Sequence, residues 1–143
     1  MGPGLAESWY ISPDGLEILS SLRKDVKFHN GETMTAQDVV SSFERAMASK
    51  FTSRITGAME SIELVDDHTV KLKMKYPYGP VIGCIATANM GIVSEKAVTA
   101  DPEGFARNPV GTGPYKFVKW NTGTKITFEA FEDYYRGPRE LTR

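Results

Sequence analysis

The chain has 143 residues, of which 41% are hydrophobic and 24% are charged, and its formal net charge at pH 7 is -1. This composition is typical of a globular protein with about one domain's core. It lacks the clustered basic residues of a nucleic-acid-binding surface, so we expect no nucleic-acid partner. The single cysteine excludes an internal disulfide.

The first third of the chain predicts one strand between two tight turns. Residues 12–15 read Ser-Pro-Asp-Gly, which suits a type I turn because proline is second and glycine fourth. Residues 16–28 place apolar side chains mostly two apart, which predicts a strand with Val26 and Phe28 continuing on one face. Residues 29–32 contain Asn-Gly, a pair that favours positive φ, and predict a second turn.

The clearest helix is predicted from Thr35 to near Ser49. Thr35 is a good N-cap residue, and Asp38 follows at the spacing of a capping box. The apolar positions recur at helical spacing and form one stripe, Val39, Val40, Phe43, Ala46 and Met47.

The second half predicts two hairpins with short elements between them. Residues 62–64 and 70–76 alternate apolar and charged side chains, which predicts an antiparallel pair with its lysines facing water. Residues 76–93 are uncharged, but their prolines and glycines argue against a membrane span and favour a loop, a short helix and a strand at 92–93. Ser94 predicts a helix cap, and residues 115–120 and 126–130 predict paired strands.

Gly111 and Gly113 raise the question of a ligand loop. A phosphate loop needs free backbone N–H groups at the start of a helix. Here Pro114 removes one donor, and a strand pattern follows. From the residues alone, the favoured interpretation is a loop that enters a strand, where glycine permits unusual φ.

The other reactive residues form no recognisable catalytic or metal-binding pattern. His29 and His68 stand beside Asn or Asp in predicted turns, so we expect both to be solvated. Cys84 lies in an apolar stretch and is expected to be an inert thiol. We therefore expect no enzyme activity, no metal and no cofactor. A hydrolase that uses Cys84 and one histidine is kept as an alternative.

Several stretches together resemble one family. In chain order they are PGLAESWYISPDG, LRKDVKFHNGETMTAQDVVSSFERA, VDDHTVKLKM, NPVGTGPYKFVKW and FEDYYRG. This ordered set is similar to the extracytoplasmic solute-binding proteins of peptide-type ABC transporters, family 5, which include dipeptide-, oligopeptide- and nickel-binding proteins. The resemblance runs along essentially the whole chain.

The resemblance implies a fold and a domain organisation. The fold would be α+β, with a mixed, mostly antiparallel sheet and a few helices, as in the inserted subdomain of a two-lobed periplasmic-binding-protein type fold. Family members are several times longer, so we expect the chain to be a fragment of a longer protein. Residues 1–107 would form the inserted subdomain of the first lobe, and residues 108–143 the strands that return to that lobe.

The resemblance also implies a function and a site. The protein would capture peptides outside the cytoplasmic membrane and deliver them to an ABC permease, without covalent chemistry. It would be periplasmic, or extracellular and lipid-anchored in a Gram-positive cell, and we expect no transmembrane segment in this chain. The expected ligand-binding residues are Gly111, Thr112, Gly113, Pro114, Thr56, Gly57 and Ala58.

Other functions stay open at this point. The same scaffold is used in the family for non-peptide solutes, namely a nickel chelate, haem, an oligosaccharide or an opine. A structural interaction domain is a further alternative, in which the lysines of residues 70–76 would form a docking surface.

Overall fold

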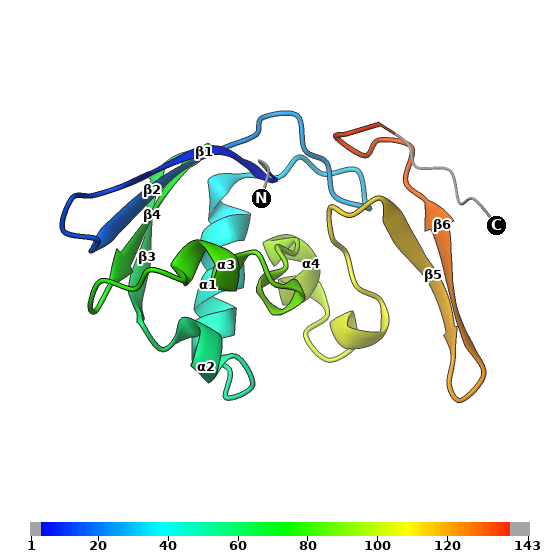
Figure 1. Cartoon of the computed structure of the whole chain (residues 1–143). Helices are drawn as coiled ribbons and strands as arrows, with labels where there is room; N and C mark the ends of the chain where they lie inside the picture. Colours follow the sequence, from blue (N-terminus) through cyan, green and yellow to red (C-terminus); the bar gives the residue numbers. More distant parts are fainter. Residues whose placement is uncertain (1–3, 138–143) are drawn as a thin grey trace. The chain divides into compact units, whose positions relative to one another are not determined.

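The computed structural model describes residues 4–137 and confirms an α+β chain built of antiparallel strands and short helices (Figure 1). The chain divides into two compact units. The first contains residues 4–24 and 35–92, and the second contains residues 25–34 and 93–137. The assignment of residues 1–107 and 108–143 to parts of a lobe stays a prediction.

The first unit is built on a four-stranded antiparallel sheet with the order β1-β2-β4-β3. The strands are β1 (Ala6–Ile11), β2 (Glu17–Leu22), β3 (Met59–Asp66) and β4 (Thr69–Met74). The predicted hairpin is confirmed, with Ile62 opposite Leu72. β1 was not predicted, because five of its six residues are exposed and it lacks the alternation that a half-buried strand shows.

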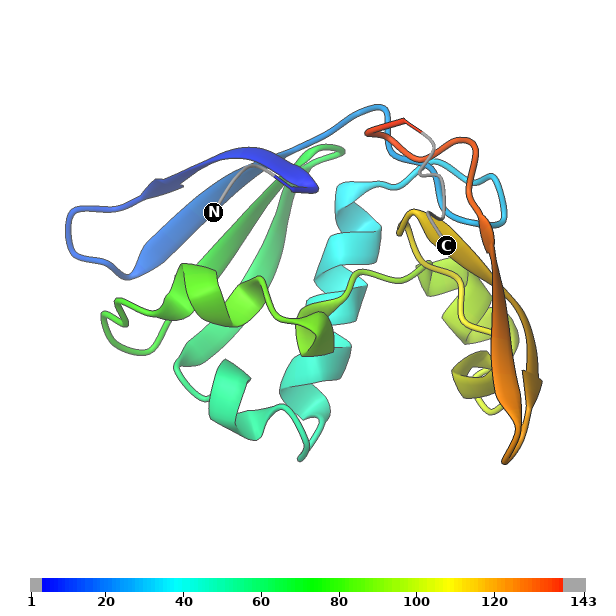
Figure 2. The ribbon, with the colours of Figure 1, turned by 45° about the vertical axis from the view of Figure 1, so that its right-hand side comes forward.

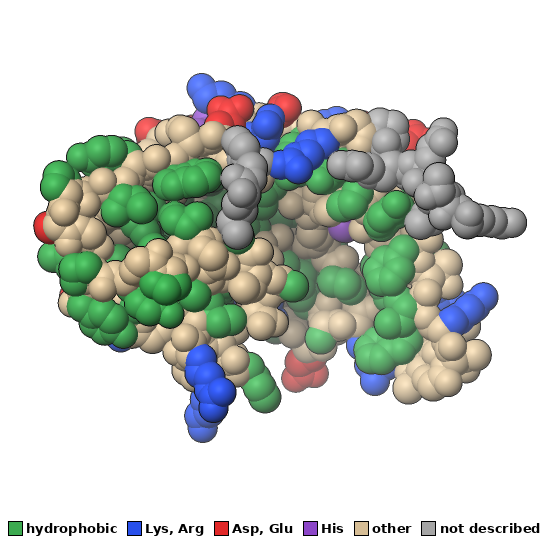
Figure 3. Space-filling model, viewed as in Figure 1, with side chains coloured by type: hydrophobic (Ala, Val, Ile, Leu, Met, Phe, Trp, Pro, Cys, Tyr) green, Lys and Arg blue, Asp and Glu red, His purple; other side chains and the backbone are tan. Residues whose placement is uncertain are grey.

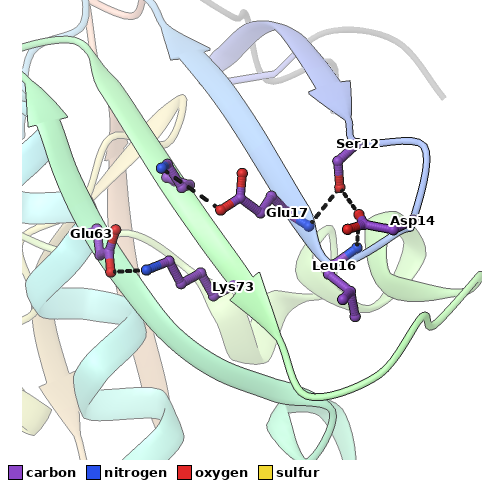
Figure 4. Close-up of polar contacts among 7 residues, drawn as sticks. Ser12, Asp14, Leu16, Glu17, Glu63 and Lys73 are labelled. Atoms are coloured by element: carbon purple, nitrogen blue, oxygen red, sulfur yellow. Dashed lines mark hydrogen bonds and ion pairs between the residues drawn. The ribbon is translucent and has the colours of Figure 1, made fainter.

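The two faces of β4 differ as its sequence predicts. Val70, Leu72 and Met74 are buried. The lysines between them do not simply face water, because each pairs with a glutamate of a neighbouring strand (Figure 4). Lys71 Nζ lies 3.8 Å from Glu17 Oε1, and Lys73 Nζ lies 2.6 Å from Glu63 Oε1. Such solvent-screened pairs contribute little to stability, so the sheet depends mainly on its buried face.

The turn before β2 has the predicted form. The backbone N–H of Gly15 donates to the carbonyl of Ser12 at 2.8 Å, and Gly15 has a φ of +70°. Asp14 accepts a hydrogen bond from the N–H of Leu16 at 3.0 Å (Figure 4). The turn therefore satisfies its own backbone and leads directly into β2.

Helix α1 (Ala36–Ala48) contacts β3 and β4 and covers one face of the sheet (Figure 2). The predicted capping box is present, and the Thr35 N–H donates to Asp38 Oδ2 at 2.9 Å. The predicted end of the helix near Ser49 is also confirmed, since Ser49 is the C-cap residue. The apolar stripe is buried except for Met47, which is half-buried.

Residues 76–93 contain short helices, as predicted. They are α3 (Val81–Ile85) and the 3-10 helix η1 (Ala88–Met90), and α2 (Ser53–Thr56) precedes them in the chain. The predicted strand at residues 92–93 is wrong, since Val93 forms only one isolated bridge, to Gly111. None of the helices within residues 4–137 is long and apolar enough to cross a membrane.

The second unit contains a β-hairpin and two short helices. Strands β5 (Tyr115–Asn121) and β6 (Lys125–Ala130) pair antiparallel, as predicted, around a turn in which Gly123 has a φ of +79°. Ser94 caps α4 (Glu95–Ala100) by accepting a hydrogen bond from the Ala97 N–H at 3.1 Å. The 3-10 helix η2 (Phe105–Arg107) follows.

Residues 25–34 do not extend β2, contrary to the prediction. They fold back on themselves, so that the Met34 N–H donates to Val26 O and the Phe28 N–H donates to Glu32 O, at 2.9 and 2.8 Å. Gly31, with a φ of +85°, makes the expected turn. The three apolar side chains of this segment, Val26, Phe28 and Met34, are almost fully buried.

Glu32 links this turn to the start of α4. Its carboxylate lies 2.6 Å from Lys96 Nζ and accepts a hydrogen bond from the Ser94 hydroxyl at 3.2 Å. Asn30 Nδ2 donates to the same group at 2.8 Å. Hydrogen bonds with Lys96 and then Asn30 lower the pKa of Glu32, so the carboxylate is charged at neutral pH.

We expect Thr35→Ala to destabilise the chain by about 1 kcal/mol, because it removes the N-cap hydroxyl of α1. Urea unfolding followed by circular dichroism measures this change. Thr35→Ser keeps the hydroxyl and serves as the matched control, with stability close to that of the native chain. Equal stability of the Ala and Ser variants would contradict the role of the cap.

Candidate functional site

The loop of residues 108–114 belongs to the second unit and is held at both ends by backbone hydrogen bonds. On one side, the Ser94 N–H donates to Val110 O at 3.3 Å. On the other, the Phe131 N–H donates to Pro114 O at 2.9 Å. The loop therefore has a fixed entry and exit, and its middle residues, Gly111 to Gly113, lie between them.

His29 holds the middle of this loop. Its backbone N–H donates to Gly111 O at 2.9 Å, and the Gly111 N–H donates to its ring Nδ1 at 3.3 Å. The ring Nε2 lies 3.0 Å from Gly113 O. Because Nδ1 accepts a hydrogen bond, the proton of the neutral ring must be on Nε2, which donates to Gly113 O.

The prediction that His29 is a solvated turn residue is therefore wrong. The residue does stand in a turn, but its ring is half-buried, and it packs edge-on against Phe131 with the ring centroids 5.1 Å apart. Burial lowers the pKa of His29 below its ordinary value of 6.5; the bond to Gly113 opposes this, and the positive charge of Lys116 adds to it. His29 is thus neutral at neutral pH.

The glycines of this loop are not needed for unusual φ, contrary to the prediction from residues alone. The positive-φ glycines among residues 4–137 are Gly15, Gly31, Gly123 and Gly137. A Cβ built on Gly113 meets no atom within 4 Å. Glycine at this position therefore leaves open space directly beside the backbone, whereas the side chain of Thr112 is buried.

An open pocket of about 350 Å³ lies beside the loop. It mixes polar and apolar groups from three segments of the second unit. Lys116 and Glu129, on paired positions of β5 and β6, form an ion pair at 2.8 Å within it. The lining residues are His29, Asn30, Asn108, Pro109, Val110, Lys116, Phe117, Val118 and Glu129. Its amides and charges offer hydrogen bonds to a polar solute.

The other predicted ligand residues, 56–58, belong to the first unit. The hydroxyl of Thr56 donates to Thr52 O at 3.1 Å, and the side chains of Thr56 and Ala58 are buried. Gly57 is exposed, and its carbonyl accepts a hydrogen bond from Lys75 Nζ at 3.2 Å. Of the three, only Gly57 presents itself to solvent. Contact between these residues and a solute stays a prediction.

The first unit has a separate, mainly apolar pocket of about 260 Å³. It is lined by side chains of the sheet, α1, α3 and η1, among them Trp9, Leu22, Phe43, Ile82 and Met90. In Figure 3, hydrophobic side chains gather over this unit on the side of β1 and α3. The pocket lacks the converging polar groups that orient a polar solute.

The reactive side chains of the first unit do not form a catalytic pair. Cys84 is half-buried, and its sulfur lies 4.0 Å from the Tyr78 hydroxyl; this contact raises the pKa of Tyr78. His68 stands in a turn, as predicted, but it is half-buried and its Nδ1 has no hydrogen-bond partner. The hydrogen bond of the thiol goes to Tyr78 rather than to His68 of the same unit. Within residues 4–137, no group of three or more His, Cys, Asp or Glu residues is placed to hold a metal ion.

Comparison with known proteins places the chain among solute-binding proteins. The family "Bacterial extracellular solute-binding proteins, family 5 Middle" matches residues 1–143. Heme-binding protein A of Haemophilus influenzae is 34% identical, covering 99% of this chain and 30% of that protein. The dipeptide-binding protein of Escherichia coli is 30% identical, covering 93% of this chain and 30% of that protein. The chain thus spans about 30% of the length of these relatives.

A solved structure agrees with this match. It is the ABC transporter-associated periplasmic binding protein DppA of Helicobacter pylori, in complex with the peptide STSA. The TM-score is 0.87 at 33% identity, and the match covers 96% of this chain and 32% of that protein. The expectation that the chain corresponds to part of a longer, two-lobed binding protein is therefore confirmed.

Two glycine substitutions should differ in their effect on folding. A Cβ on Gly57 lies 2.9 Å from Ser53 O, so Gly57→Ala should destabilise the chain by about 1–2 kcal/mol through overpacking. Gly113→Ala meets nothing within 4 Å and should leave the free energy of unfolding within about 0.5 kcal/mol of the native value. Urea unfolding of both variants tests this, and a reversed order would show that the loop is packed differently.

Proposed function

The chain belongs to the family 5 bacterial extracellular solute-binding proteins, and from this premise we propose that it serves in capturing peptides for an ABC importer. The solute would be bound outside the cytoplasmic membrane and delivered to a permease. The observation that carries this proposal is the match to peptide-binding relatives over nearly the whole chain. The chain represents about a third of such a protein, so the activity belongs to the larger assembly of lobes.

We propose that the loop of Gly111, Thr112, Gly113 and Pro114 approaches the solute through its backbone. Three features support this role. The loop is fixed at both ends, open space lies beside Gly113, and a polar pocket adjoins it. Four of the loop's carbonyls, those of Val110, Gly111, Gly113 and Pro114, are already hydrogen-bonded. The loop would therefore meet a peptide chiefly at the open backbone beside Gly113, without selecting for particular side chains. Gly57, which is exposed, is proposed as a second point of contact, with Thr56 and Ala58 supporting it from the core.

The proposed mechanism is binding and closure without covalent chemistry. In a two-lobed binder, a hinge movement encloses the solute, and burial together with hydrogen bonding supplies the affinity. The thiol of Cys84 makes its hydrogen bond with Tyr78, which gives no support to a nucleophile–base pair. We propose a periplasmic location, or an extracellular one with a lipid anchor.

A non-peptide solute is the alternative. One close relative is named for haem binding, and it matches 99% of this chain. Proteins with the same scaffold therefore bind different solutes, and the fold alone does not determine which solute is bound. The polar character of the pocket beside the loop favours a solute rich in amides or charges over a purely apolar one.

Native mass spectrometry of the protein purified gently from its own cells would test the solute class. A ladder of co-purified peptide masses is expected, because backbone recognition tolerates many side chains. A single sharp non-peptide mass would show that the solute is not a peptide and would identify another solute class. A protein that stays empty after exposure to peptide mixtures would contradict the transport role.

We expect Gly113→Ala to weaken peptide binding by about tenfold, equivalent to about 1.4 kcal/mol, because its methyl group occupies the space beside the loop. Calorimetry with trialanine as the probe measures this. Gly79→Ala is the matched control, since its Cβ also meets nothing within 4 Å and Gly79 lies in the first unit. Unchanged affinity in the Gly113 variant would remove the loop from the site.

A further inference from the structure

The contact between His29 and the loop depends on which ring nitrogen carries the proton. Nδ1 accepts a hydrogen bond from the Gly111 N–H at 3.3 Å, and Nε2 lies 3.0 Å from Gly113 O. Together with the backbone bond from His29 N to Gly111 O, at 2.9 Å, the residue makes three contacts with a stretch of three loop residues. Only the neutral ring with its proton on Nε2 satisfies all of them.

Protonation of the ring would break one of these contacts in particular. A proton on Nδ1 would point at the Gly111 N–H, so that two donors would face each other across the former hydrogen bond. The bond from Nε2 to Gly113 O and the backbone bond to Gly111 O do not require a neutral ring. Protonation would therefore release the Gly111 N–H, while the Gly111 carbonyl and the Gly113 carbonyl stay held.

The charged groups around His29 do not compensate an imidazolium. Lys116 and Glu129, which line the same pocket, are paired with each other at 2.8 Å. Lys27, two residues before His29, is paired with Asp133 at 3.0 Å, next to the segment that carries Phe131. Within the described part of the chain, no carboxylate forms an ion pair with His29.

We infer that His29 is a positioning residue of the solute-binding loop and that its protonation loosens the loop, so that the site loses solute on acidification. The inference about the loop rests on the hydrogen-bond geometry of His29. The inference about solute rests in addition on the proposed function of residues 111–114. The two parts are therefore tested by separate measurements.

The burial of the His29 ring also makes the stability of the chain depend on pH. The pKa of His29 is below 6.5 in the folded state, so the unfolded chain binds more protons in the interval between these two values. The contribution of neutral His29 to the free energy of unfolding is fully present above pH 6.5 and decreases as the pH falls through this interval. It then levels off below the folded pKa as far as His29 is concerned.

Nitrogen-15 NMR of the full 143-residue chain would test the loop part. At pH 7.5 the His29 ring should show an unprotonated Nδ1 and a protonated Nε2. On acidification, the Gly111 amide resonance should shift with a midpoint below 6.5, and more than that of Gly113. A proton on Nδ1 at pH 7.5, or a Gly111 amide that does not follow the titration of His29, would overturn the inference.

Substitutions then separate His29 from other titrating groups. His29→Asn keeps an acceptor near the position of Nδ1, and His29→Gln keeps a donor near the position of Nε2, but neither titrates. The Gly111 shift should disappear in both variants. His68→Gln is the matched control in the other unit and should keep it. Persistence of the shift in the His29 variants would assign it to another group, and the titration of the native chain still decides the matter if a variant does not fold.

Calorimetry with trialanine at pH 7.0 and pH 5.0 would test the solute part. The whole binding protein, purified from its own cells with its other lobe present, should bind about fivefold more weakly at pH 5.0, the size expected for one lost hydrogen bond, and its His29→Gln variant should show no such change. Equal affinity at both pH values, with the loop still titrating, would overturn the solute part and leave the proposed function standing. Absence of binding at both pH values would count against the proposed function, while the NMR result on the loop would be unaffected.

Discussion

The second unit depends on one tight turn, residues 28–32. Gly31 closes it in the left-handed region, and the Phe28 N–H donates to Glu32 O. Three side chains of this turn reach different parts of the unit. Phe28 enters the core, His29 reaches the loop of residues 111–113, and Glu32 reaches Ser94 and Lys96 at the start of α4. Segments that lie far apart in the chain are thereby held together by this one turn.

Local patterns were sufficient for the elements whose stabilising contacts are local. The capping box of Thr35 and Asp38, the apolar stripe of α1 and the alternation of β4 all appear in the sequence and are present in the structure. β1 was missed because it is an exposed edge strand, and its residues do not show the alternation of buried and exposed positions that predicts a strand. The segment of residues 25–34 was misassigned because its period-two pattern is that of a small fold-back as much as of a continued strand.

The candidate site was located only through the resemblance to a family, and the reason given for its glycines was incorrect. Neither Gly111 nor Gly113 has positive φ; Gly113 instead leaves its backbone uncovered. The role of His29 was missed altogether. Its partner Gly111 is 82 residues away, and a histidine beside Asn-Gly carries no local sign of such a contact. The available signal was indirect: His29 directly follows the buried Phe28 at the start of a turn, which suggests that its ring lies near the core.

The β5–β6 hairpin also affects how the isolated chain behaves. Within residues 4–137 these strands pair only with each other, so both outer edges have unpaired backbone groups. Val118, Trp120, Ile126 and Phe128 are each about half exposed on it. An isolated two-stranded sheet is only marginally stable in water. Covering these apolar side chains with another chain would stabilise the hairpin. The melting temperature of the isolated chain is then a property of the solution as well as of the molecule, because it rises with the concentration of whatever pairs with that edge.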